Sequence, residues 1–350
     1  MSLVQEKGCG MSKRIFETAQ LGSLTAKNRL VRSATWEGIA TPEGGITPIG
    51  YDIYRELAAG GVGTIITGFT SVSDTDQYID GMMRLSSDAL VPQYRRLTDI
   101  IHEQDVPVLA QLALGGYYPT PTAEPVEPDD MTPAQIEHVI RQFVDAARRA
   151  EQAGFDGVQV HVAHFFFLSR FVSPAANHRT DEWGGSTANR ARIVCRIIEG
   201  IREAAPSLHV CAKVNCTDLV AGGIEEAEAL ELCRIYVQAG LESVEVSGNG
   251  TSVAGVRPGV GEAYFGRFGA LAAHELPIPV MLVGGMRSSG TIQSVLDHTG
   301  IEFVSLSRPL LREPDWPNEL KEGTSSQSAC ISCNRCYNTP AHRCVFRLRG

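Results

Sequence analysis

Two histidines, His161 and His164, stand three positions apart directly after the short apolar run 157–160. A parallel barrel builds its reaction site where its strands end, and paired imidazoles at such an end can bind a substrate or move protons. A zinc site needs a third ligand, and none is near in the sequence. A structural role is the alternative, but two histidines at one strand end disfavour it. We therefore expect a substrate-binding pair.

Lys213 ends a second apolar run, 210–214. A lysine that points into a barrel mouth needs a partner for its charge, such as a phosphate, a carboxylate or an electron-rich ring. The alternatives are a side chain that extends to solvent at the strand edge and a Schiff-base lysine of a barrel lyase. Gln111, at the end of another apolar run, offers a donor and an acceptor to the edge of a heterocycle.

Two glycines and an arginine near the end of the chain suggest a phosphate cradle. Gly284 and Gly285 follow the apolar run 279–283, and Arg308 follows 303–305. Backbone N–H groups at the glycines, with the guanidinium beside them, match the phosphate site common in (β/α)8 barrels. The alternative is a tight turn and a surface arginine.

The nine cysteines form two groups. Five are scattered, several of them in apolar segments where a buried thiol is ordinary. The other four are crowded near the C-terminus, at Cys330, Cys333, Cys336 and Cys344. Without an export signal, such a cluster favours metal or redox chemistry over disulfides.

The elements that must position these residues alternate between β-rich runs and helical periodicity. We expect strands at 30–34, 64–67, 107–111, 157–161, 209–214, 243–247, 279–283 and 303–305. The clearest helix begins with a capping box at 132–135, and its apolar face continues to Ala150. Eight strands alternating with helices predict a (β/α)8 TIM barrel, with extra loop structure after the first, third, fourth and sixth strands.

We expect one barrel domain at 12–322, an N-terminal extension or tag at 1–11, and a cysteine-bearing tail at 323–350. The second Met-Ser, at Met11, motivates the first boundary. A formal net charge of -9 argues against a nucleic-acid surface, and no apolar stretch is long enough to cross a membrane. Residues 1–11 lack the apolar core of a secretory signal, so we expect a cytoplasmic protein.

Taken together, the motifs resemble the old yellow enzyme family of FMN-dependent NAD(P)H oxidoreductases over nearly the whole chain. Shorter matching pieces are Lys27-Asn28-Arg29-Leu30-Val31, Gln111-Leu112, His161-x-x-His164, Val283-Gly284-Gly285 and Ser307-Arg308-Pro309. The long and specific piece is Phe171-x-Ser173-Pro174-x-x-Asn177-x-Arg179-x-Asp181-x-Trp183-Gly184-Gly185-Ser186-x-x-Asn189-Arg190.

The resemblance implies a (β/α)8 barrel with FMN over its mouth and NADH or NADPH as co-substrate. Flavin-lining residues are then Ser33, Ala34, Thr35 and Gly68, with Gln111 at the pyrimidine edge and Gly284, Gly285, Ser307 and Arg308 at the phosphate. Lys213 stands where the family places a basic residue beside flavin N1 and the C2 carbonyl, and its positive charge stabilises the anionic reduced flavin. His161 and His164 donate hydrogen bonds to a carbonyl or nitro oxygen of the acceptor. The polar loop 177–192 is expected to be structural.

The sequence departs from the family pattern directly after His164. The family usually has Gly-Tyr there, and the tyrosine protonates the substrate, whereas this chain has Phe165 and Phe166. Tyr117, Tyr118, Tyr264 or solvent are the substitute proton sources. We expect an apolar pocket walled by Trp36, Phe69, Phe165 and Phe166. A hydrophobic or aromatic acceptor and low activity on simple enones follow from it.

The tail resembles the iron–sulfur ligands of the dienoyl-CoA and trimethylamine dehydrogenase branch, where the third cysteine is usually one residue further on. We therefore expect reduced thiols or zinc at Cys330, Cys333, Cys336 and Cys344 ahead of an iron–sulfur cluster.

The function expected from the sequence is hydride transfer by a ping-pong route from NADH or NADPH to an apolar, electron-poor small molecule. The alternatives are a flavin-binding barrel with a decayed or regulatory role and a Lys213-based lyase. A homo-oligomer is expected by analogy with the family.

Overall fold

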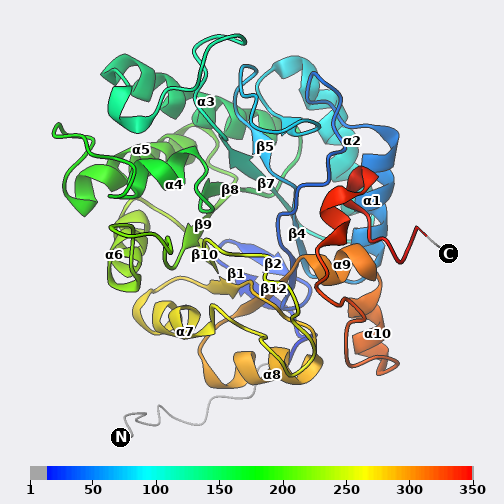
Figure 1. Ribbon diagram of the computed structural model, residues 1–350. Helices are drawn as coiled ribbons and strands as arrows, with labels where there is room; N and C mark the ends of the chain where they lie inside the picture. The colour runs from blue at the N-terminus through cyan, green and yellow to red at the C-terminus, as the bar shows by residue number, and fades with distance from the viewer. Residues whose placement is uncertain (1–13, 349–350) are drawn as a thin grey trace, which may run out of the picture.

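The computed structural model describes residues 14–348, which form a closed barrel of eight parallel strands ringed by helices (Figure 1). The barrel strands are β3 (Leu30–Arg32), β4 (Thr64–Ile66), β7 (Val108–Ala113), β8 (Gly157–Val162), β9 (His209–Asn215), β10 (Ser243–Ser247), β11 (Val280–Leu282) and β12 (Phe303–Leu306). Each pairs with its neighbour in parallel, and the pairing of β4 with β7 belongs to the same closed circuit. The predicted fold class and all eight strand positions are confirmed.

Helices cover the outside of the barrel between the strands (Figure 1). They are α1 (Pro48–Ala59), α2 (Val91–His102), α3 (Pro133–Gln152), α5 (Thr187–Ala204), α6 (Glu226–Gln238), α7 (Gly266–Glu275), α8 (Ser289–His298), α9 (Arg308–Arg312) and α10 (Trp316–Glu322). The capping box predicted for α3 is present, because Thr132 and Gln135 each bond the other's backbone N–H. Its apolar face, from Ile136 to Ala150, is buried as expected.

An antiparallel hairpin that the strand pattern did not predict precedes the barrel. It joins β1 (Ala19–Leu21) to β2 (Leu24–Ala26). Its buried side chains pack with residues near the starts of barrel strands, such as Met281 and Phe303. The hairpin therefore contributes to the core at the end of the barrel opposite the strand C-termini.

Short elements interrupt the long connections. The loop after β7 holds the 3-10 turn η2 (Pro128–Asp130), and the loop after β8 holds α4 (Phe167–Val172). Beyond the four predicted insertions, the connection after β4 contains β5 (Thr70–Ser71), β6 (Met83–Arg84) and η1 (Asp88–Leu90). The connection 248–265 after β10 has no regular element apart from an isolated bridge between Arg257 and Val260.

The polar loop 177–192 is structural, as expected. Asn177 Nδ2 donates to the carbonyls of Phe171 (2.7 Å) and Trp183 (2.9 Å). Arg179 Nη1 donates to the carbonyls of Pro128 and Met131 at 2.8 and 2.7 Å. These bonds tie the loop to its own backbone and to the connection after β7.

The C-terminal tail packs back onto the barrel mouth instead of extending into solvent. It contains the 3-10 turns η3 (Arg335–Asn338) and η4 (Pro340–His342). Asn334 Nδ2 donates to the Ser252 carbonyl at 2.8 Å, and Ser332 Oγ donates to the Val256 carbonyl at 3.0 Å. Both acceptors belong to the connection after β10, so the tail and this connection form one layer.

Within residues 14–348, no helix combines the length and the apolar character needed to cross a bilayer. The predicted extension at 1–11 and Cys9 lie outside the described residues.

Candidate active site

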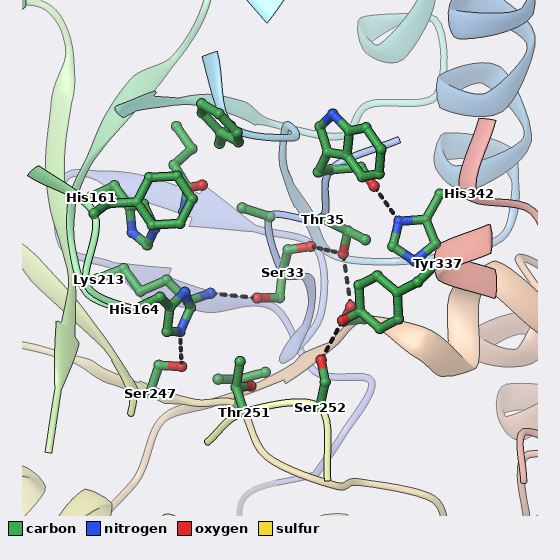
Figure 2. Close-up of a pocket in the computed structure, with 17 residues that line it drawn as sticks. Ser33, Thr35, His161, His164, Lys213, Ser247, Thr251, Ser252, Tyr337 and His342 are labelled. Atoms are coloured by element: carbon green, nitrogen blue, oxygen red, sulfur yellow. Dashed lines mark hydrogen bonds between the residues drawn. The ribbon is translucent and has the colours of Figure 1, made fainter. Parts of the chain in front are cut away.

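The main cavity lies at the C-terminal ends of the strands and has a volume of about 270 Å³ (Figure 2). Most of the predicted site residues line it, namely Ser33, Ala34, Thr35, Trp36, Phe69, Gln111, His161, His164, Phe166, Lys213 and Ser307. Its other lining residues, which were not predicted from the sequence as site residues, are Ser247, Thr251, Ser252, Val283, Tyr337 and His342.

A second, smaller cavity shares Thr251, Ser252, Val283 and Ser307 with the main one. The predicted phosphate residues Gly284, Gly285 and Arg308 line it. Gly285 has a φ of +79°, and a Cβ there would lie 2.9 Å from the Tyr264 ring, so no larger residue fits without displacement. Ser305 Oγ, also on the wall, has no hydrogen-bond partner among the described residues. The cavity therefore has the open backbone and the spare hydroxyl that an anion requires.

The two histidines lie together at the end of β8, and neighbouring strands hold His164 in place. Their ring centroids lie 5.1 Å apart in an edge-to-face arrangement. Asn215, at the end of β9, accepts the backbone N–H of His164 at 3.0 Å, and Ser247, at the end of β10, bonds its Nε2 at 2.8 Å (Figure 2). His164 and Phe165 have φ values of +64° and +59°, a conformation that non-glycine residues rarely adopt. The turn after β8 is thus strained where it aims the imidazole.

Both imidazoles are neutral at physiological pH. Burial is the main cause that holds the pKa of His161 well below its usual 6.5, and the neighbouring His164 and Lys213 act in the same direction. Burial likewise lowers the pKa of His164 to about 3, with the Lys213 charge adding to the effect and Glu245 opposing it. A neutral imidazole carries one N–H, so the pair can supply hydrogen-bond donors without acting as strong acids.

These lowered pKa values predict a pH-dependent stability. Below pH 6.5 the unfolded chain protonates His161 and His164 while the folded chain keeps them neutral, so unfolding takes up protons and the free energy of unfolding decreases as the pH decreases. We expect His164→Asn to flatten this fall by about 1 kcal/mol per pH unit between pH 6 and pH 4. Urea unfolding at several pH values measures it. His209 and His342, whose pKa values burial also lowers, affect both proteins alike. Identical slopes would contradict the assignment of a neutral His164.

Lys213 finds its charge partner inside the barrel. Its Nζ donates to Glu245 Oε2 and to Ser33 Oγ, each at 2.8 Å. Glu245 Oε2 also accepts from Gln159 Nε2 at 2.9 Å, and Gln159 Oε1 accepts from Gln111 Nε2 at 2.8 Å. Sequence reasoning missed Glu245 and Gln159, although a carboxylate in the middle of the predicted barrel strand 243–247 was a usable signal.

An aromatic wall lies beside the histidines. The Phe166 ring centroid is 4.7 Å from that of His161 and 5.1 Å from that of Phe69. Among the described residues, Phe165 and Gly68 line neither cavity, and Gly68 donates its N–H to the Tyr54 hydroxyl at 2.7 Å. The predicted proton sources Tyr117 and Tyr118 also line neither cavity, while Tyr264 lines the smaller one.

The tail supplies a second wall, which the sequence did not indicate. The Tyr337 and His342 rings pack with centroids 4.5 Å apart and planes tilted by 49°, and the His342 ring centroid lies 5.8 Å from that of Trp36. The Tyr337 hydroxyl bonds Ser252 Oγ, and His342 Nδ1 donates to the Trp36 carbonyl (Figure 2). Because a carbonyl only accepts, this bond places the proton on Nδ1. The main cavity is therefore closed on one side by residues that follow the barrel.

All four tail cysteines line a third small cavity beside Arg308. They are free thiols, and burial together with the neighbouring Cys330 raises the pKa of Cys336. No set of three or more His, Cys, Asp or Glu side chains within residues 14–348 has the arrangement of a metal site. The expectation of reduced thiols or zinc in the tail, ahead of an iron–sulfur cluster, thus stays a prediction.

Comparison with known proteins decides the family. A sequence model of the NADH:flavin oxidoreductase / NADH oxidase family matches residues 14–327. The chain belongs to this family. It is an FMN-dependent NAD(P)H oxidoreductase of old yellow enzyme type, as the sequence motifs implied.

Individual relatives agree with this assignment. The 4,4'-dithiodibutanoate disulfide reductase of Rhodococcus erythropolis is 32% identical over 95% of this chain and 95% of its own length. The NADPH dehydrogenase of Listeria innocua is 29% identical over 89% of this chain and 95% of its own. The solved old yellow enzyme homologue from Zymomonas mobilis shares the fold, with a TM-score of 0.74 at 21% identity, over 91% of this chain and 95% of that one.

Proposed function

We propose that this protein reduces an apolar or aromatic, electron-poor small molecule, using hydride that NADH or NADPH delivers through FMN. The observation that carries the proposal is the placement of two neutral imidazoles, Lys213 and an aromatic wall around one cavity at the barrel mouth. Bound FMN would supply hydride to the acceptor. The residues of the chain would then bind the acceptor, polarise it and exclude water.

The cavity residues fit FMN. Gln111 and Lys213 present hydrogen-bonding groups to the edge of a flat heterocycle, and Ser33, Ala34 and Thr35 line the same cavity. Gly284, Gly285, Ser307 and Arg308 surround the adjoining small cavity, where Ser305 Oγ has no partner among the described residues. We assign these residues to the flavin ring and to its phosphate, respectively. Gly68, which lines neither cavity, would act only through the backbone of the strand end.

The histidine pair would polarise the acceptor. N–H groups of His161 and His164 would donate to one carbonyl or nitro oxygen, which withdraws electron density from the adjacent double bond. Because the imidazoles are neutral, their contribution to catalysis is hydrogen bonding and not proton transfer. The Phe166 and Phe69 rings shield this end of the cavity from water and favour an apolar acceptor.

The proton for the second half of the reaction has no donor at position 166. We expect Phe166→Tyr to raise the rate of enone reduction by roughly tenfold to 100-fold, since a positioned general acid typically contributes at least that much. The measurement is reoxidation of the reduced enzyme by 2-cyclohexenone in a stopped-flow instrument. Tyr78→Phe, which removes a hydroxyl beside the same ring cluster, is the matched control. An unchanged rate in Phe166→Tyr would mean that protonation does not limit turnover.

An acceptor panel tests the proposed substrate class. We expect slow turnover of 2-cyclohexenone and faster turnover of aromatic nitro compounds and aryl enones under NADH or NADPH. 4,4'-Dithiodibutanoate belongs in the panel, because the relative from Rhodococcus is named for it. Fast turnover of 2-cyclohexenone would contradict the proposal, and negligible turnover of every acceptor would favour the decayed or regulatory alternative.

The lyase alternative is disfavoured by the surroundings of Lys213. A Schiff-base lysine must be an uncharged nucleophile, whereas Lys213 is buried in an ion pair with Glu245 at 2.8 Å. Inactivation by borohydride in the presence of an aldehyde or ketone would instead support the lyase function.

The four tail cysteines are proposed to be reduced thiols or to bind zinc. Metal analysis of anaerobically purified protein tests this, and stoichiometric iron and sulfide would replace it with a cluster. A cytoplasmic location and a homo-oligomer likewise remain proposals, and light scattering of the purified protein measures the latter.

A further inference from the structure

Glu245 is a buried carboxylate for which the family assignment gives no role. It has no exposed surface, and it lies on β10 inside the barrel. Oε2 receives hydrogen bonds from Lys213 and Gln159, while Oε1 has no partner among the described residues. Burial alone would raise the pKa of Glu245, but the Lys213 charge and the hydrogen bonds from Lys213 and Gln159 lower it below its ordinary value. The side chain is therefore an ionised carboxylate.

An ionised carboxylate can only accept hydrogen bonds, and this fixes the orientation of the two side-chain amides beside it, those of Gln159 and Gln111. Gln159 must turn its NH2 group toward Glu245. The same nitrogen lies 3.5 Å from Cys211 Sγ. Burial raises the pKa of Cys211 to about 12, so its neutral sulfur is a weak acceptor that agrees with this orientation.

The orientation of the Gln159 amide in turn fixes the orientation of the Gln111 amide. With its nitrogen committed to Glu245, Gln159 has only Oε1 left to offer, and it accepts from Gln111 Nε2 at 2.8 Å. Gln111 then leaves Oε1 without a partner among the described residues, on a side chain that lines the main cavity. At the same end of the cavity, Lys213 keeps one N–H beyond its bonds to Glu245 and Ser33.

We propose that Glu245 is a positioning residue that fixes Gln111 as an acceptor and Lys213 as a donor toward the bound heterocycle. This inference rests on the proposed placement of FMN. The pyrimidine edge of FMN carries one N–H flanked by two carbonyls, so an amide oxygen for the N–H and an ammonium group beside it form a complementary pattern. A Gln111 turned the other way would present NH2 groups to that N–H.

The cost of this arrangement argues against a merely structural role. A buried carboxylate with one unpaired oxygen loses hydration that its single ion pair does not fully replace. A glutamine at the same place could still bond Lys213 and would avoid burying a carboxylate, although it would leave the Lys213 ammonium without an opposite charge. What it would not do is fix the direction of the Gln159 amide, because a carboxamide can face either way.

The test exchanges the two side chains. In Glu245→Gln the amide groups of Gln159 and Gln111 are no longer held in one orientation. We therefore expect the apo-protein to bind FMN about tenfold more weakly, as measured by quenching of flavin fluorescence. In the double variant Glu245→Gln/Gln159→Glu the carboxylate still accepts from Gln111, and the new carboxamide oxygen at position 245 can accept from Lys213. We expect its FMN dissociation constant to lie within about threefold of wild type. Ser243→Ala is the matched control, because it changes β10 at the far end, where Ser243 bonds His209.

Two further measurements distinguish a loss of amide orientation from a general loss of folded structure. The melting temperature of each apo-protein reports folding, and the visible spectrum of each FMN complex reports the surroundings of the ring. Unchanged FMN affinity in Glu245→Gln would overturn the proposal, as would a double variant that binds as weakly as the single one. If Glu245→Gln does not fold, the FMN dissociation constant of the double variant decides alone. A value within about threefold of wild type supports the proposal, and weaker binding overturns it. A wild-type protein that binds no FMN would overturn the proposed function as well, which distinguishes the two failures.

Discussion

Replacing His164 with alanine is expected to slow reduction of an aromatic acceptor by roughly 100-fold, and His161→Ala by a similar factor. Removal of one preorganised donor to a developing oxyanion typically costs about 100-fold to 1000-fold. His161 is buried and His164 is half-buried, and both imidazoles are neutral, so each loss removes a hydrogen-bond donor that the fold holds in place. The measurement is the rate at which acceptor reoxidises the reduced enzyme in a stopped-flow experiment.

His164→Asn separates hydrogen bonding from acid catalysis. An asparagine keeps an N–H donor but cannot transfer a proton, so we expect it to retain activity within about tenfold of wild type. The FMN content of every variant serves as the control for cofactor loss. Equal loss in His164→Asn and His164→Ala would contradict the hydrogen-bonding role, and wild-type rates in both alanine variants would remove the pair from catalysis.

Replacing Lys213 with methionine is expected to have two large effects with different causes. The first is on stability, because Glu245 is left as a buried charge without a partner, which typically costs about 3–5 kcal/mol. The second is on chemistry, since the positive charge beside the proposed flavin site offsets the negative charge that reduction adds. We expect reduction by NADPH to slow by roughly 100-fold.

The double variant Lys213→Met/Glu245→Gln separates these effects. Its carboxamide is neutral, so most of the lost free energy of unfolding should return, while reduction by NADPH should stay roughly tenfold or more slower than in wild type. Urea unfolding and anaerobic stopped-flow reduction measure the two quantities. Full recovery of the reduction rate in the double variant would show that Lys213 acts only by neutralising Glu245.

The sequence predicted the barrel because its strands are buried on both faces. Such strands appear as short β-rich runs between segments of helical periodicity, and all eight predicted runs became barrel strands. The hairpin β1–β2 escaped this pattern, since its two strands are three residues each and mix buried with exposed positions. Its packing against the barrel floor depends on tertiary contacts that periodicity does not encode.

The site was predictable where a residue follows a strand and less so where distant segments meet. Gln111, His161 and Lys213 were found from their strand ends, and they do share one cavity. Tyr337 and His342 reach that cavity because the tail folds back over the mouth, which no local pattern shows. Glu245 was overlooked because its meaning depends on Lys213, which is 32 residues away in sequence but adjacent across the β9–β10 pairing.

The visible absorption spectrum of the purified protein tests the central claim most directly. After reconstitution with FMN, we predict the absorption bands of a bound flavin, loss of those bands on anaerobic addition of NADPH, and their return when an aromatic nitro compound or aryl enone is added. A protein that stays colourless after incubation with FMN, or whose bound flavin NADPH does not bleach, would contradict the account.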